Sequence, residues 1–188
     1  RSAIALRLIS ELEQPVHVTH ILRKGGFGYL RTKMDSWRQM AKQQIMLVLT
    51  DLDRANCVVE FRDQWLAGRS IPDSLLLRIA VREVEAWVLA DHVAMSELLG
   101  KRVVFPVDPD ALPDPKQTLM GLAKRASRPI RDDLIKFRDG QLSQGLGYNV
   151  RLAHWVNTVW CPQRAAALSP SLARARSRPQ SAALAFGT

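Results

Sequence analysis

The feature that most constrains the fold is an apolar run that ends in two charged residues. Residues 45–50 read "IMLVLT", and Asp51, Leu52 and Asp53 follow directly. A strand that is apolar on both faces is typical of the interior of a parallel sheet, because helices cover both sides of such a sheet. The run therefore predicts a buried strand whose carboxyl end lies at the two aspartates.

The pattern around this strand predicts alternating helices and strands. Helices are expected at 2–13, 29–44, 58–68 and 82–100, the last with a break near Asp91, and strands at 16–23, 45–50 and 75–81. This order is typical of an α/β domain with a small parallel sheet flanked by helices, in which the carboxyl ends of the strands carry the site. A proline-rich loop spans 105–116, and the rest is helical in pattern, interrupted by glycines at 140–147. We expect an α/β core at 1–112 and a largely helical C-terminal extension at 113–188 that packs on it.

Composition limits the class of protein. The chain has 188 residues, 47% hydrophobic and 24% charged, which fits a globular domain. No apolar stretch approaches the roughly 20 residues that cross a bilayer, and no secretory signal precedes the first helix, so a cytoplasmic location without membrane contact is expected. The two cysteines, Cys57 and Cys161, form no paired motif. A formal charge of +9 favours polyanionic partners, nucleic acid above all.

The aspartate pair has two interpretations. In an extended backbone Asp51 and Asp53 would point the same way, and two neighbouring carboxylates repel unless a cation such as Mg²⁺ neutralises them. An aspartate in a turn or a helix cap explains the same spacing equally well. The position after a buried strand favours a metal site.

A second acidic pair follows the next predicted strand. Glu83 and Glu85 stand in "REVEAW", and they project together if the helix begins after them. Glu83 would instead share a helix face with Trp87 and Asp91 if the helix begins earlier. Arg78 and Arg82 offer a third interpretation, in which they neutralise the glutamates as structural ion pairs.

Basic residues are concentrated in the C-terminal part. The segment 124–138 has six basic residues and two acidic ones, and 174–178 has three arginines. They can contact a nucleic-acid backbone or simply face solvent. The glycine turn "GGFG" matches no nucleotide-binding motif, no nucleophile elbow occurs, and the four histidines show no metal-binding spacing. Covalent acyl chemistry is disfavoured.

Several motifs together resemble a known family. They are "GGFGYL", "LVLTDLD", "RIAVREVEAWVLAD", "LPDPKQTL", "GYNVRLAHWV" and "SPSLARA". Over nearly the whole chain they are similar to the bacterial domain-of-unknown-function family 4276, a group related to Toprim domains and to nucleases of the OLD type.

This resemblance implies a Toprim-like (Rossmann-like) core that binds Mg²⁺ or Mn²⁺ for phosphoryl transfer on nucleic acid. Asp51 and Asp53 match the family's DxD. Glu83 would complete the metal site, and Glu85 would complete or orient it. The residues expected to position the phosphate backbone are Lys116, Lys124, Arg125, Arg128 and Arg131.

The chain departs from the family pattern at its start. A first strand ending in a metal-binding glutamate is expected before the segment that begins at Arg1, and Glu11 and Glu13 in the first helix are poor substitutes. The chain therefore looks truncated and lacks the expected third carboxylate.

The function expected from the resemblance is a Mg²⁺-dependent endonuclease, with a role in anti-phage defence and DNA favoured over RNA. One alternative is a non-catalytic module that assists an ATPase encoded nearby or senses nucleic acid, and a homodimer is also compatible with the sequence. A phosphatase of the haloacid-dehalogenase type, with Asp51 as nucleophile, is disfavoured because Ala55 stands at the Thr or Val position of its motif.

Overall fold

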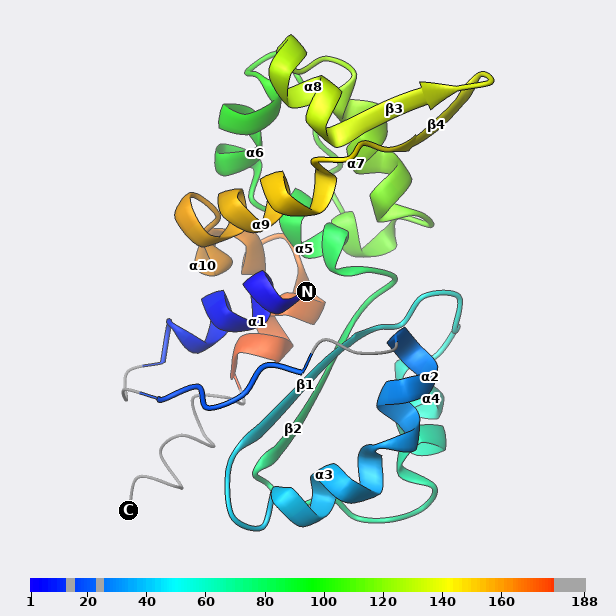
Figure 1. Ribbon diagram of the computed structural model, residues 1–188, viewed down its shortest axis with the longest axis vertical. Coiled ribbons are helices and arrows are strands. Elements are labelled where there is room, and N and C mark those ends of the chain that lie inside the picture. Colours follow the sequence, from blue (N-terminus) through cyan, green and yellow to red (C-terminus); the bar gives the residue numbers. More distant parts are fainter. Residues whose placement is uncertain (13–15, 23–25, 178–188) are drawn as a thin grey trace.

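The computed structural model describes residues 1–12, 16–22 and 26–177 (Figure 1). Its helices and its single 3-10 turn are α1 (Ser2–Ile9), α2 (Gly26–Thr32), α3 (Met34–Met40), α4 (Val58–Leu66), α5 (Val84–Leu89), α6 (His92–Leu99), η1 (Pro109–Ala111), α7 (Pro115–Ala123), α8 (Arg128–Leu134), α9 (Tyr148–Thr158) and α10 (Pro162–Ala166). Residues 170–177 are also helical. The strands are β1 (Met46–Asp51), β2 (Leu75–Ala80), β3 (Ile135–Arg138) and β4 (Gln141–Gln144).

The centre of the α/β part is a two-stranded parallel sheet. β1 pairs with β2 in a register that runs from Met46 opposite Leu75 to Asp51 opposite Ala80. Both strands therefore end at the same edge. The helices α3 and α4 pack on this sheet through a compact apolar core, which consists of Met34, Trp37, Ala41, Val48, Leu52, Phe61, Trp65, Leu75 and Leu77. The expected mixed α/β fold with a small parallel sheet flanked by helices is confirmed.

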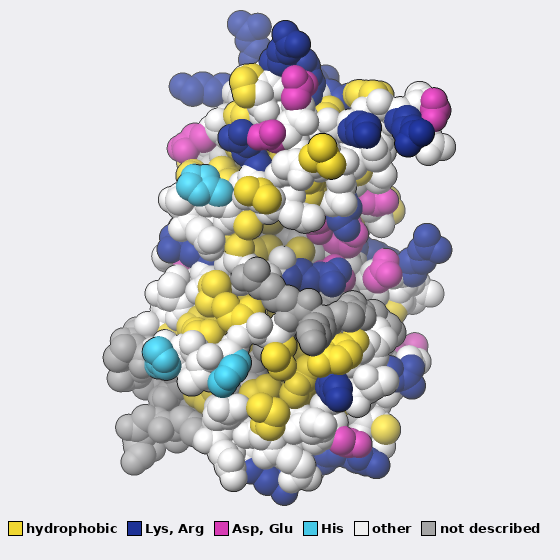
Figure 2. All heavy atoms as spheres, in the orientation of Figure 1, with side chains coloured by type: hydrophobic (Ala, Val, Ile, Leu, Met, Phe, Trp, Pro, Cys, Tyr) yellow, Lys and Arg dark blue, Asp and Glu magenta, His cyan; other side chains and the backbone are white. Residues whose placement is uncertain are grey.

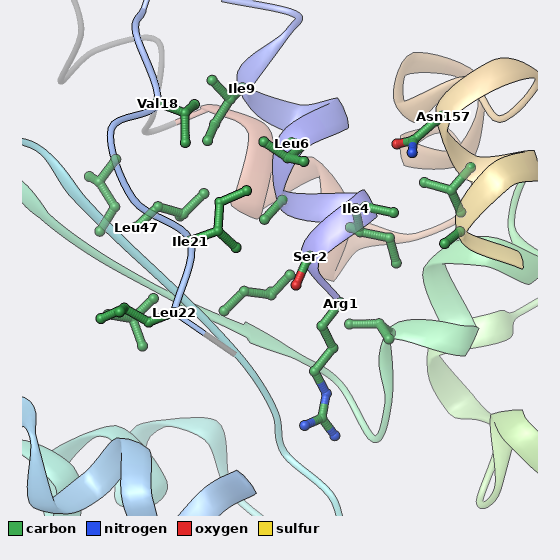
Figure 3. Close-up of a pocket in the computed structure, with 18 of the residues that line it drawn as sticks. Arg1, Ser2, Ile4, Leu6, Ile9, Val18, Ile21, Leu22, Leu47 and Asn157 are labelled. Atoms are coloured by element: carbon green, nitrogen blue, oxygen red, sulfur yellow. The ribbon is translucent and has the colours of Figure 1, made fainter. Parts of the chain in front are cut away.

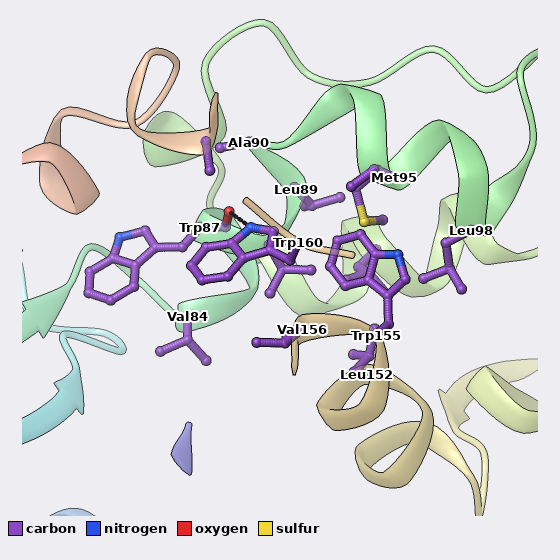
Figure 4. Close-up of a cluster of buried hydrophobic side chains, with 14 of the residues drawn as sticks. Val84, Trp87, Leu89, Ala90, Met95, Leu98, Leu152, Trp155, Val156 and Trp160 are labelled. Carbon is purple, nitrogen blue, oxygen red and sulfur yellow. Dashed lines mark hydrogen bonds between the residues drawn. The ribbon is translucent and has the colours of Figure 1, made fainter. Parts of the chain in front are cut away.

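A larger core joins α1 to the helices that follow β2. Trp87 and Trp160 are fully buried at its centre (Figure 4). Each indole nitrogen has a hydrogen-bond acceptor. Trp87 Nε1 donates to Ser171 Oγ at 2.7 Å, and Trp160 Nε1 donates to the Trp87 carbonyl at 3.2 Å. This core combines helices from both sides of residue 112, with α1 packed against α9. No helix among the described residues is long and apolar enough to cross a membrane.

Two expected elements differ from the structure. Residues 16–22 form no strand, and Arg23 lies outside the described residues, as does Glu13. Their alternating pattern is compatible with a strand, but they pair with no described strand, and pairing is what defines one. The helix expected at 29–44 is two short helices, α2 and α3, separated at Lys33.

The C-terminal part also contains a β-hairpin that the helical pattern did not predict. β3 and β4 pair antiparallel around Asp139 and Gly140, which have positive φ values of 52° and 74°. An Asp-Gly pair favours this kind of two-residue turn, because Gly and Asp tolerate positive φ better than other residues. Figure 1 shows the hairpin projecting from the body of the molecule beside α7.

Candidate acidic site at the carboxyl ends of the parallel strands

Asp51 is the last residue of β1 and its carboxylate is buried. The side chain is 6% exposed, and the Val84 N–H donates to Oδ1 at 3.1 Å. The guanidinium of Arg1 pairs with Oδ2. Burial raises the pKa of Asp51, while Arg1 and the Val84 N–H act in the opposite direction. The carboxylate thus links β1 to the start of α5.

Glu83 lies immediately before α5, in extended backbone with φ −146°. Its Oε2 accepts the backbone N–H of Lys116 at 3.0 Å, and its Oε1 accepts the Lys116 ammonium at 2.6 Å. Two donors from one residue therefore fix this carboxylate against the first turn of α7. The helix begins after Glu83, so the interpretation in which Glu83, Trp87 and Asp91 share one helix face is wrong.

Glu85 lies in the first turn of α5 and is buried. The Tyr148 hydroxyl donates to its Oε1 at 3.2 Å, and the Lys116 ammonium is 3.6 Å from the same oxygen. Burial raises the pKa of Glu85, with Lys116 opposing and the neighbouring carboxylates adding to the shift. Burial and the nearby carboxylates also raise the pKa of Tyr148 above its ordinary value, so this hydroxyl keeps its proton and acts as a donor.

Together Asp51, Glu83 and Glu85 form what we call the acidic cluster. Lys116 interacts electrostatically with all three carboxylates. Burial lowers the pKa of its ammonium, but the hydrogen bond to Glu83 and the charges of Glu85 and Asp51 outweigh burial, so the pKa is raised. Lys116 therefore stays charged. The structure brings Asp51, Glu83 and Glu85 together at the sheet edge where the sequence places them, and it adds Lys116 from α7 as their cationic partner.

Asp53 takes a different position from its partner in the motif. β1 ends at Asp51, and Asp53 has a left-handed backbone with φ 54°. Its N–H donates to the Arg82 carbonyl at 2.8 Å, while its side chain is exposed. The extended backbone that would aim both aspartates the same way is thus absent at Asp53. Arg82, with φ 59°, donates to the carbonyls of Asp53 and Ala55.

A groove of about 1150 Å³ runs along β1 and reaches the acidic cluster. It is lined by Asp51, Glu85 and Lys116 where it reaches the cluster, and elsewhere by mainly apolar residues of α1, β1, α9 and 16–22, with His17 and His20 among them. Figure 3 shows Leu6, Ile9 and Ile21 around this space, with Arg1 at its border. In Figure 2 hydrophobic side chains gather on the same face. The cluster therefore has an approach from solvent.

The other basic residues lie beyond the far end of α7. Lys116 is in its first turn and Lys124 is its C-cap, about 12 Å further along the helix axis at 1.5 Å per residue. Arg125 is exposed, and Arg128 and Arg131 each lie 3.5 Å from a carboxylate oxygen of Asp132. These residues do not contact the acidic cluster. Figure 2 shows Lys and Arg side chains gathered at this end of the molecule.

The donor set of the acidic cluster fits a hard dication, because carboxylate oxygens are the ligands that Mg²⁺ and Mn²⁺ prefer. The side-chain arrangement is less favourable: among the described residues no group of three His, Cys, Asp or Glu is placed to hold a metal ion. Lys116 and Arg1 contact the oxygens that a metal would use. Metal binding thus requires these two cations to move aside.

Sequence reasoning missed two members of this site. Tyr148 is 63 residues from Glu85, and Arg1 is 50 residues from Asp51. No local spacing relates such residues, because α9 and α1 reach the sheet edge only through tertiary packing. The one available signal for Tyr148 is its place in "GYNVRLAHWV", at the start of a helix.

Comparison of the chain with family models, with curated proteins and with solved structures gave no match. The Toprim-like resemblance stays a prediction that rests on the sequence motifs.

Proposed function

We propose that the protein is a metal-dependent phosphoryl-transfer enzyme of Toprim-like type that cleaves nucleic acid. One observation carries the proposal: three carboxylates converge at the carboxyl edge of the parallel sheet beside a charged lysine, and two of them, Asp51 and Glu85, line an open groove. The edge where parallel strands end is where α/β proteins place their ligands. The formal charge of +9 supports a polyanionic substrate.

In this proposal Asp51, Glu83 and Glu85 hold Mg²⁺ or Mn²⁺. Once bound, the ion neutralises charge on the phosphate and makes a water molecule more acidic. Displaced from Glu83, the Lys116 ammonium is free to hold a phosphate oxygen. The Tyr148 hydroxyl keeps Glu85 in place. Hydrolysis forms a bond from water oxygen to phosphorus and breaks one phosphate ester bond, so no covalent enzyme intermediate is needed.

The test is cleavage of plasmid DNA, single-stranded DNA and RNA by the full-length chain with Mg²⁺ or Mn²⁺. We expect Asp51→Asn and Glu85→Gln to lower the rate at least about 100-fold, the size of effect seen when a charge-stabilising group is removed. Asp63→Asn, which alters an exposed carboxylate on α4, should leave the rate unchanged. Asp53→Asn should retain most activity, because Asp53 lies outside the cluster.

Metal binding is measured separately by calorimetric titration with Mn²⁺. Asp51→Asn should weaken it, and Lys116→Met should strengthen it, because the competing ammonium is gone. Wild-type cleavage rates in Asp51→Asn and Glu85→Gln would contradict the proposal.

A second candidate is a non-catalytic module that assists an ATPase or senses nucleic acid. The observation that favours it is the neutralisation of the acidic cluster by Lys116 and Arg1. It predicts no cleavage under any metal condition, also with the partner ATPase present, and unchanged nucleic-acid binding in Asp51→Asn. A phosphatase with Asp51 as nucleophile is disfavoured, because both carboxylate oxygens of this buried side chain are engaged.

A further inference from the structure

We infer that the β3–β4 hairpin holds a single strand of nucleic acid. The binding surface consists of Lys124, Lys136, Phe137 and Arg138, which we call the hairpin surface. The inference rests on the proposed function, in which nucleic acid is the substrate, and adds the place where the strand is held.

Phe137 is the first observation. Phe137 is 57% exposed, although phenylalanine side chains normally lie in a core. The ammonium of Lys124 lies 5.1 Å from the ring centroid. The ammonium lies over one face of the ring, so an unpaired base would stack on the other face or in place of the ammonium. Stacking on an exposed aromatic ring contributes about 1–3 kcal/mol per base.

The charges around the ring are the second observation. Lys136 and Arg138 flank Phe137 in β3, so they project from the opposite face of the ribbon. Two of the nearby acids are engaged elsewhere: Asp132 lies 3.5 Å from both Arg128 and Arg131, and Asp133 accepts Arg151 Nε at 2.8 Å. The third, Asp139, lies 3.7 Å from Arg138 itself, in a solvent-exposed pair of the kind that contributes little.

Lys124 and Lys136, by contrast, form no ion pair with any residue in the described ranges. Arg138 has an 80% exposed side chain. Positive charge therefore remains on both faces of the hairpin. Lys124 would meet a phosphate beside a base stacked on Phe137, and Lys136 and Arg138 would meet the strand where it passes to the other face of the hairpin.

The occupant follows from this combination. In a duplex the faces of the bases are stacked on each other, so no base face is accessible to Phe137. A single strand exposes both base faces and phosphates. The hairpin surface also lies on a path to the acidic cluster. β4 packs on α7, and α7 runs from Lys124 back to Lys116.

The experiment measures binding of the full chain to labelled oligothymidylate, oligouridylate and a duplex of equal length, in EDTA. We expect the double variant Lys136→Ser, Arg138→Ser to weaken single-strand binding about tenfold and to lower the salt slope by about two. Phe137→Ala should weaken binding about tenfold and leave the salt slope unchanged. The two single-strand probes decide between DNA and RNA.

The matched control is the double variant Lys42→Ser, Arg62→Ser, which removes the same charge at the α3–α4 end of the molecule. It should change affinity far less. Because the altered side chains are exposed, thermal unfolding of each variant should match wild type, and this is measured alongside.

Wild-type affinity in both hairpin variants would overturn the inference and leave metal-dependent cleavage untouched. Hairpin-dependent binding without any cleavage would overturn the catalytic proposal and leave the inference standing. Tighter binding to the duplex than to either single strand would also overturn the inference.

Discussion

Asp91 and Glu85 are both buried carboxylates, yet their surroundings differ. Asp91 is 1% exposed and accepts the Cys161 N–H at 2.7 Å and two Arg164 donors at 2.9 Å each. It also caps α6 through the Ala94 N–H at 3.3 Å. Glu85 has one hydroxyl donor and an ammonium 3.6 Å away. The carboxylate oxygens of Asp91 are thus occupied by structural donors, whereas those of Glu85 have fewer donors and can accept a ligand.

Asp91→Ala should lower the free energy of unfolding by about 3 kcal/mol. It removes a buried carboxylate that pairs with the partly exposed Arg164, accepts the Cys161 N–H and caps α6. Urea unfolding monitored by tryptophan fluorescence measures the change. Asp63→Ala, at an exposed site on α4, is the control and should leave stability almost unchanged. A similar small effect of Asp91→Ala would contradict the structural role.

Glu85→Gln should change the pH dependence of stability. Burial raises the pKa of Glu85 above its ordinary 4.5, so the folded chain binds more protons than the unfolded chain in this range. Stability therefore falls as pH rises from the unfolded pKa through the folded one. Gln carries no titrating charge, so the variant lacks this loss.

The measurement is urea unfolding of wild type and Glu85→Gln at a series of pH values from acid to neutral. The difference in unfolding free energy should shift in favour of the variant as pH rises. A difference that stays constant across the series would show that Glu85 is not destabilised by ionising. Lys116 opposes the upward shift of the Glu85 pKa, so its charge reduces the divergence between the two curves.

At the level of helices and strands, the two glycines at 121 and 145 have opposite roles. Gly121 lies in α7, and a Cβ there meets no atom within 4 Å. Gly145 follows β4, and a Cβ would come within 2.3 Å of the Asp133 carbonyl oxygen. Its N–H donates to the Leu134 carbonyl at 3.0 Å, which fixes the backbone at this point.

Gly121→Ala should raise the free energy of unfolding by about 0.5–1 kcal/mol, because alanine is the better helix former. Gly145→Ala should lower it by about 1–3 kcal/mol, as overpacking does. Both variants are compared by thermal and urea unfolding. Equal effects of the same sign would show that the β4–α9 connection adapts freely.

The sequence predicted the parallel strands well because each carries its own signal. Both are mainly apolar segments, "MLVLTD" and "LLLRIA", and β1 and β2 lie within a residue of the expected positions. Residues 16–22 have an equally good local pattern and no partner strand. The hairpin depended on Asp139 and Gly140, a signal that the surrounding helical pattern obscured.

The candidate site was predictable to the extent that its residues follow strands. Asp51 ends β1, and Glu83 and Glu85 lie in the turn after β2 and at the start of α5, so the topology of a parallel sheet brings them together. The direction of Asp53 was not predictable from spacing, because it depends on one left-handed residue. The pairing of Lys116 with Glu83 and Glu85 depends on how α7 packs against α5, which no local pattern encodes.

For the whole molecule, the basic segment 124–138 lies at one end, whereas the acidic cluster lies near the middle, at the start of α5 (Figure 1). We expect single-strand binding to lose about 10- to 100-fold in affinity between low and physiological salt, as a surface that contacts a few phosphates does. Fluorescence anisotropy over a salt series measures the slope. Affinity that is independent of salt would contradict a binding mode governed by phosphate contacts.

The paired left-handed residues Asp53 and Arg82 have a consequence for variation of this sequence. Aspartate, asparagine and glycine tolerate such a backbone better than other residues, so the geometry alone accounts for an aspartate at position 53. In a saturation library selected only for folding, position 53 should accept Asn and Gly and reject valine and isoleucine. At position 51 the constraint is the burial of a charged side chain, so this position should accept a different set of amino acids. The two halves of the DxD motif would then be inherited for different reasons.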